Sequence, residues 1–107
     1  MNFMGKIYRQ GDVLFKKIEE LPKKKRKLET DIIVRGEATG HAHRITNGTL
    51  FSSWQRGRGP QLYIKASKGA RVIHEEHKEI ELEKGLYEVI RQREYDPNAS
   101  ENPWVED

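Results

Sequence analysis

Short β-branched and apolar runs recur along the chain, and a turn signal separates each run from the next. The clearest runs are Val13–Ile18, Thr30–Arg35 and the alternating Lys78–Glu83, in which Ile80 and Leu82 share one face. Apolar residues at helical spacing are hard to find. The pattern predicts an all-β fold, a single small barrel or sandwich of about seven or eight mostly antiparallel strands.

Asn47-Gly48 lies between two strand-like runs and is the strongest hairpin signal in the chain. Both positions of such a turn favour a positive φ, which Asn and Gly tolerate. A hairpin here would place His43 near the base of a strand that pairs with residues 50–54. Residues 55–60 are expected to form a flexible basic loop. Further turn signals are Gly11-Asp12, Lys68-Gly69 and Lys84-Gly85.

The length of 107 residues fits one domain with a modest core. We expect a β domain over residues 1–95, with a polar basic loop at 19–29, and an acidic extended or disordered tail at 96–107. The chain has no cysteine, so any metal must be held by nitrogen and oxygen ligands. The lack of cysteine fits a cytoplasmic protein. No apolar run approaches the roughly 20 residues of a membrane helix, and no signal peptide is evident.

The net charge is +3, and it is unevenly distributed. Lys23–Lys27 is an unbroken basic run, whereas Glu94–Asp107 holds five acidic residues and no basic one. Such runs are most often solvated surface. The sharper interpretation is that the basic run and Arg56-Gly57-Arg58 contact the phosphates of RNA or DNA. Aromatic residues are not interleaved with the basic run, so the sequence shows no stacking platform for single strands.

All four histidines fall into two short clusters, His41-Ala42-His43 and His74–His77. Residues two apart on a strand share a face, so His43 is expected to face inward with Ile45. Imidazole nitrogens suit Zn, Fe and Ni, and an added carboxylate extends the choice to Mn. We therefore predict a divalent metal site with His41, His43, His74 and His77 as ligands, of which His43 and then His74 are the best positioned. Nearby carboxylates are Glu37, Glu75 and Glu76. A structural interpretation also stays open, because histidines occur in hydrogen-bonded cores and on charged turns.

The motifs resemble those of small uncharacterised proteins of bacteria and their phages. The matching stretches are Gly11–Leu14, Gly36–Arg44, His74–His77 and Gln92–Tyr95, which span nearly the whole domain. The resemblance implies that the clusters belong to one site, but it implies no activity. The spacing of His41 and His43 also resembles cupins, although no glutamate follows at the cupin distance.

Two classes of function follow from these residues. In a metal-dependent hydrolase acting on phosphodiesters or another anionic substrate, Glu37, His43 and Glu76 would be catalytic, and Arg44, Arg91 or Arg93 would bind the substrate. A metal-free variant would use two histidines as acid and base. The alternative is a non-enzymatic module of a phage or mobile element that binds nucleic acid or protein, or a virion-type structural protein. A homo-oligomer is compatible with both classes.

Overall fold

The computed structural model describes residues 6–35 and 40–91, and this part of the chain forms β-strands without any helix. The strands are β1 (Ile7–Gln10), β2 (Val13–Ile18), β3 (Arg26–Leu28), β4 (Ile32–Arg35), β5 (Ala42–Gln55), β6 (Gly59–Ile73), β7 (Ile80–Leu82) and β8 (Gly85–Arg91). The predicted all-β class is therefore confirmed. No helix in the described residues is long and apolar enough to cross a membrane. The acidic tail lies outside the described residues.

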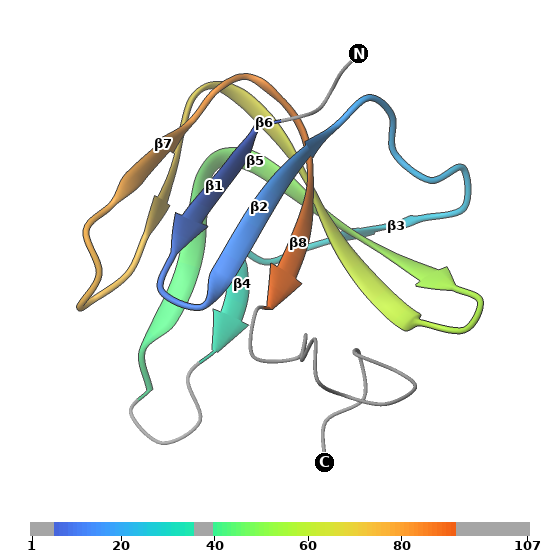
Figure 1. Ribbon diagram of the computed structural model, residues 1–107, viewed down its shortest axis with the longest axis horizontal. Helices are drawn as coiled ribbons and strands as arrows, with labels where there is room; N and C mark the ends of the chain where they lie inside the picture. Colours follow the sequence, from blue (N-terminus) through green and yellow to red (C-terminus); the bar gives the residue numbers. More distant parts are fainter. Residues whose placement is uncertain (1–5, 36–39, 92–107) are drawn as a thin grey trace.

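One antiparallel sheet contains all eight strands in the order β1-β2-β8-β6-β5-β3, with β4 added to β5 and β7 added to β6. The long hairpin of β5 and β6 arches through the molecule and carries strands on both sides (Figure 1). One half of the hairpin is flanked by β4 and β7, and the other half by β3 and β8. The sheet therefore folds over on itself, and β1 approaches β7 without closing a barrel.

The predicted hairpin at Asn47-Gly48 is wrong, because both residues lie inside the continuous strand β5. The pairing of β5 with β6 shifts register between Thr46 and Gly48. Asn47 has a φ of 56°, and its side-chain amide donates to the carbonyl of Gly69, which has a φ of 83°. The two expected turns thus face each other as irregularities in paired strands, and the sheet bends there. His43 consequently pairs with β4 rather than with residues 50–54.

The real turn of the long hairpin lies at Arg56–Arg58, within the stretch expected to be a flexible loop. The N–H of Arg58 donates to the carbonyl of Gln55 at 2.9 Å, and Gly57 has a φ of 82°. The stretch expected to be a polar loop also contains a strand, since β3 pairs with Leu50–Ser52 of β5. The expected turn at Gly11-Asp12 is confirmed, because it separates β1 from β2. The turn expected at Lys84-Gly85 lies one residue earlier, at Glu83-Lys84, since Gly85 is the first residue of β8.

The core lies in the fold of the sheet and is built from the inward side chains of both halves. Its largest fully buried side chains are Tyr87, Phe15, Leu50, Ile64, Leu82, Val13 and Val72. The alternating run at β7 behaves as expected, since Leu82 is buried and Ile80 packs against the core. Burial of such side chains contributes about 1.5–3 kcal/mol each.

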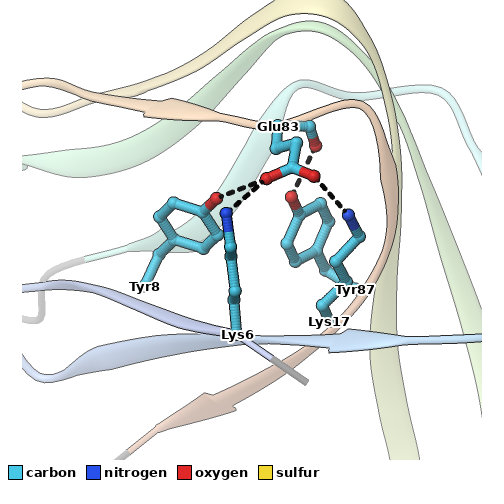
Figure 2. A network of polar contacts seen from close by, with 5 residues as sticks. All are labelled: Lys6, Tyr8, Lys17, Glu83 and Tyr87. Carbon is cyan, nitrogen blue, oxygen red and sulfur yellow. Dashed lines mark hydrogen bonds and ion pairs between the residues drawn. The ribbon is translucent and has the colours of Figure 1, made fainter. Parts of the chain in front are cut away.

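Glu83, between β7 and β8, contacts side chains from the first two strands and from the segment before β1 (Figure 2). Its carboxylate accepts hydrogen bonds from the ammonium groups of Lys6 and Lys17, each at 2.8 Å. The Tyr87 hydroxyl donates to the Glu83 backbone carbonyl, and Tyr8 lies edge-on to Tyr87. The two ammonium groups lower the pKa of Glu83 to about 2. The network ties the β7–β8 turn to the first two strands.

Candidate metal centre

The two histidine clusters lie at the ends of adjacent strands. His41 immediately precedes β5 and His43 is its second residue, whereas His74 directly follows β6. His77 lies in the connection between β6 and β7. Because β5 and β6 are paired antiparallel through Arg44 and Ile73, the beginning of one strand meets the end of the other. This pairing places both clusters at one edge of the hairpin.

The imidazole ring of His74 is the centre of the group. Its centroid lies 4.4 Å from that of His43, 4.5 Å from that of His77 and 5.7 Å from that of His41. Rings bound to one tetrahedral ion, with metal–nitrogen bonds of about 2.1 Å, have centroids roughly 5 Å apart. The observed separations bracket that value.

Gln10, the last residue of β1, fixes the protonation of His43. The Gln10 side-chain nitrogen donates to the carbonyls of Val72 and Lys78, both at 2.9 Å. Its amide oxygen therefore faces His43 Nδ1, at 2.7 Å. Because an amide oxygen only accepts, Nδ1 must carry the proton, and the lone pair of His43 lies on Nε2. Metal-bound histidines are usually held in this way, with the second ring nitrogen donating to a fixed acceptor.

His43 is only 5% exposed, and its burial is the main cause of its lowered pKa. Burial lowers the pKa of His43 from 6.5 to about 4, and the charges of His74 and His77 act in the same direction. The carboxylates of Asp12 and Glu75 oppose the shift without cancelling it. A ring with this pKa is neutral at pH 7, so a metal ion would not compete with a proton for Nε2. The same pKa makes His43 a weak general base.

Glu75 and His74 are both held by backbone groups. The N–H of Ala42 donates to Glu75 Oε1 at 2.9 Å, and this bond lowers the pKa of Glu75. The N–H groups of Glu76 and His77 point at His74 Nδ1, at 3.0 and 3.3 Å. In this arrangement neutral His74 carries its proton on Nε2, so coordination through Nε2 would require the proton to move to Nδ1 and these two N–H contacts to open.

Three side chains lie near enough to share one ion after a small approach. His41, His74 and Glu75 each offer a ligand atom, and these atoms lie within 4.8 Å of one another. Ligand atoms around a tetrahedral zinc ion are roughly 3.4 Å apart. The side chains of His41 and Glu75 reach solvent, so an approach of up to about 1.4 Å needs no change in the core.

Of the other site residues predicted from the sequence, some lie at the histidine group and some do not. Glu76 lies beside the group, with Oε2 at 3.6 Å from His41 Nδ1. Arg44 lines a small cavity of about 200 Å³ with His74 and Glu75. Arg91 instead lines a cavity of about 680 Å³ between β4, β6 and β8, together with Arg35 and Arg58, and no histidine contributes to it. Glu37 and Arg93 lie outside the described residues.

Sequence reasoning missed Gln10 and the role of Gly11. Gln10 looks like an ordinary strand residue, although it stands directly before a turn and is 3% exposed. Gly11 has a φ of 61°, and a Cβ at this position would lie 2.7 Å from His77 Nε2. The turn signal at Gly11 was visible in the sequence, but its closeness to His77 depends on the fold.

A family model described as a domain of unknown function, DUF8820, matches residues 9–92. The match covers most of the chain, including Gln10 and both histidine clusters. No curated protein and no solved structure matches the chain.

Proposed function

The chain belongs to this DUF8820 family, and we propose that it binds a divalent transition-metal ion with His41, His74 and Glu75 as central ligands. The observation that carries the proposal is the closeness of one ligand atom from each, within 4.8 Å. Two nitrogens and one carboxylate oxygen form a ligand set that suits Zn, Fe, Ni or Mn better than Mg or Ca.

His43 is not one of the three side chains whose ligand atoms lie within 4.8 Å of one another, but its ring centroid is 4.4 Å from that of His74, and in this proposal it would add a further nitrogen ligand. Its Nδ1–H is donated to Gln10, so its Nε2 lone pair is free of a proton on the side of the ring away from Gln10. The acceptor Gln10 is itself held by two backbone carbonyls, which orients the ring before any ion arrives. Pre-orientation of this kind reduces the entropy lost on binding.

The reaction that best fits the surroundings is hydrolysis of an anionic ester. A bound ion would lower the pKa of a coordinated water. Arg44, which shares a cavity with His74 and Glu75, supplies a positive charge where an anionic substrate would lie. Glu76 is exposed beside His41 and is the carboxylate available to accept a proton. His43 acts as a ligand in this proposal rather than as the base.

The test is metal binding by protein purified without a histidine tag. Elemental analysis and calorimetric titration with Zn²⁺ and Mn²⁺ should give about one ion per chain. His74→Ala and Glu75→Gln should each weaken binding at least tenfold, because each removes a ligand from a small shell. Glu79→Gln is the matched control, since Glu79 is an exposed carboxylate of the same connection that pairs with Arg71.

Failure to bind either ion at micromolar concentration would overturn the proposal, as would equal binding by wild type and His74→Ala. For the reaction, the metal-loaded protein is incubated with bis(p-nitrophenyl) phosphate. Arg44→Gln should reduce hydrolysis without reducing metal content. Metal-loaded protein that shows no hydrolytic activity, and whose ion is held by four protein ligands with no open position, would favour a non-enzymatic module.

A further inference from the structure

The two ends of β5 lie on opposite sides of the molecule (Figure 1). The end away from the histidines carries a second candidate surface. Trp54, near the end of this strand, is 75% exposed. Among the described residues, Ile7 on β1 is the only other exposed large apolar side chain, at 61%. An indole left open on a strand contributes nothing to the core, and large exposed aromatic side chains commonly mark binding surfaces.

The basic run, which the sequence separates from Trp54 by more than two dozen residues, lies directly beside it. All five side chains of Lys23–Lys27 are exposed. The hydroxyl of Ser53 donates to the carbonyl of Lys24 at 2.6 Å, and Arg26 pairs with Ser52. The basic run therefore follows the last part of β5.

Arg26 and Trp54 lie on the same face of the sheet. Ser52 and Trp54 are two residues apart on β5 and share a face, and Arg26 stands opposite Ser52. Diagonal neighbours in an antiparallel pair are about 7 Å apart, within reach of long side chains. Because β3 ends the strand order on this side, the lysines face open solvent. Arg56 is also exposed, two residues beyond Trp54.

We infer that this basic–aromatic surface, formed by Lys23–Lys27, Trp54 and Arg56, binds single-stranded nucleic acid. The phosphates would follow the basic run, and an unpaired base would stack on the indole. A positive track beside an exposed aromatic ring is the combination by which single strands are held without sequence preference. This inference is independent of the metal site and goes beyond the proposed hydrolase.

Two other polyanionic partners fit the surface less well. The bases of a duplex are stacked inside the helix and do not offer a face to Trp54. An anionic membrane would need several apolar side chains to insert beside the lysines, and Trp54 has no exposed large apolar neighbour in the described residues.

The experiment measures anisotropy of a labelled 15-nucleotide poly(dT) or poly(U) strand at several salt concentrations. Each neutralised phosphate should contribute a slope of about −0.7 in the plot of log affinity against log salt. Replacing Lys23, Lys24, Lys25 and Lys27 with glutamine should reduce the slope by as much as about 3. Arg26 is kept because it belongs to the β3 ladder.

Trp54→Ala should weaken binding about tenfold and leave the salt slope unchanged, since stacking is not ionic. Trp54→Phe should retain part of the affinity. Quenching of Trp54 fluorescence by the strand is measured in a Trp104→Phe background, because the chain has two tryptophans. The charge-matched control replaces Lys16, Lys65, Lys68 and Lys84, four exposed lysines elsewhere, with glutamine.

The inference is overturned if the control variant loses as much affinity as the basic-run variant, because net charge alone would then explain binding. It is also overturned if Trp54→Ala binds like wild type, or if duplex DNA binds as tightly as the single strand. Binding to vesicles of anionic lipid with no binding to the oligonucleotides would assign the surface to a membrane instead.

Discussion

Gln10 orients His43 at the candidate site through three hydrogen bonds. Its amide donates twice to the backbone and accepts once from His43, so each of its polar atoms is used. A buried amide that is fully bonded in this way fixes its neighbours, because any rotation would leave at least one buried group unpaired. The backbone carbonyls of Val72 and Lys78 fix which end of the Gln10 amide faces His43, and that end determines which nitrogen of His43 carries the proton.

The low pKa of His43 predicts that the fold loses stability as the pH falls from 6.5 to about 4. The unfolded chain binds a proton at pH 6.5, whereas the folded chain does not until about pH 4. Between these values the unfolded state holds more protons, so the free energy of unfolding decreases with falling pH. The full decrease is about 3 kcal/mol at 1.36 kcal/mol per pKa unit.

Denaturant unfolding at pH 7.5, 6, 5 and 4.5 measures this decrease, and His43→Gln is the comparison. The charged groups that influence His43 are Asp12, His74, His77 and Glu75, and all of them remain in the variant. The variant should show a clearly shallower pH dependence. The same dependence in both proteins would assign it to groups other than His43.

Gly11→Ala should destabilise the fold and also displace His77. The positive φ alone costs about 1–2 kcal/mol for alanine. The new Cβ would lie 2.7 Å from His77 Nε2, so the exposed imidazole must move away from residue 11. Gly57→Ala separates the two effects, because Gly57 has a φ of 82° and nothing within 4 Å of the added atom.

Unfolding measurements should give similar losses for both variants. NMR of the histidine ring protons should show a changed environment for His77 in Gly11→Ala only. An unaltered His77 signal in Gly11→Ala would contradict the close approach of the turn to the ring.

At the scale of the elements, the local sequence signals predicted most strands, but they assigned the irregularity at Asn47-Gly48 to a hairpin turn. Val13–Ile18, the run before Arg35 and the alternation around Ile80 carry enough local pattern to be identified. Asn47-Gly48 was misread because an asparagine with positive φ serves equally in a two-residue turn and in a bulged strand. Only the pairing of β5 with the distant β6 decides between them.

The ion pairs of Glu83 with Lys6 and Lys17 are expected to hold the first strands to the β7–β8 turn. Glu83→Gln should lower the melting temperature, because the amide cannot replace both ion pairs to Lys6 and Lys17. The pKa of Glu83 is lowered to about 2, so the stabilisation is present above pH 4.5 and is lost as the pH falls towards 2. Glu81→Gln, an exposed carboxylate on β7, is the control. Equal melting of the two variants at pH 7 would show that the network does not stabilise the fold.

At the scale of the whole molecule, the two candidate surfaces occupy opposite ends of one strand. His43 stands near the beginning of β5 and Trp54 near its end. The sequence identified the histidines because they are rare and clustered, but the closeness of His74 to His41 and His43 depended on the pairing of β5 with β6. The sequence showed no aromatic residue within the basic run, and only the pairing of β3 with β5 brings Trp54 beside it.

Metal binding should stabilise the whole fold, because the ligands come from segments that separate on unfolding. An ion that binds only the folded state adds RT ln(1 + [L]/Kd), or about 2.7 kcal/mol at a hundredfold excess over Kd. The melting temperature of the wild type should therefore rise with Zn²⁺, and that of His74→Ala should rise far less. Trp54→Ala should respond like the wild type, since Trp54 lies at the other end of β5. If Zn²⁺ stabilises His74→Ala as strongly as the wild type, the ion binds elsewhere and the histidine group is not its site.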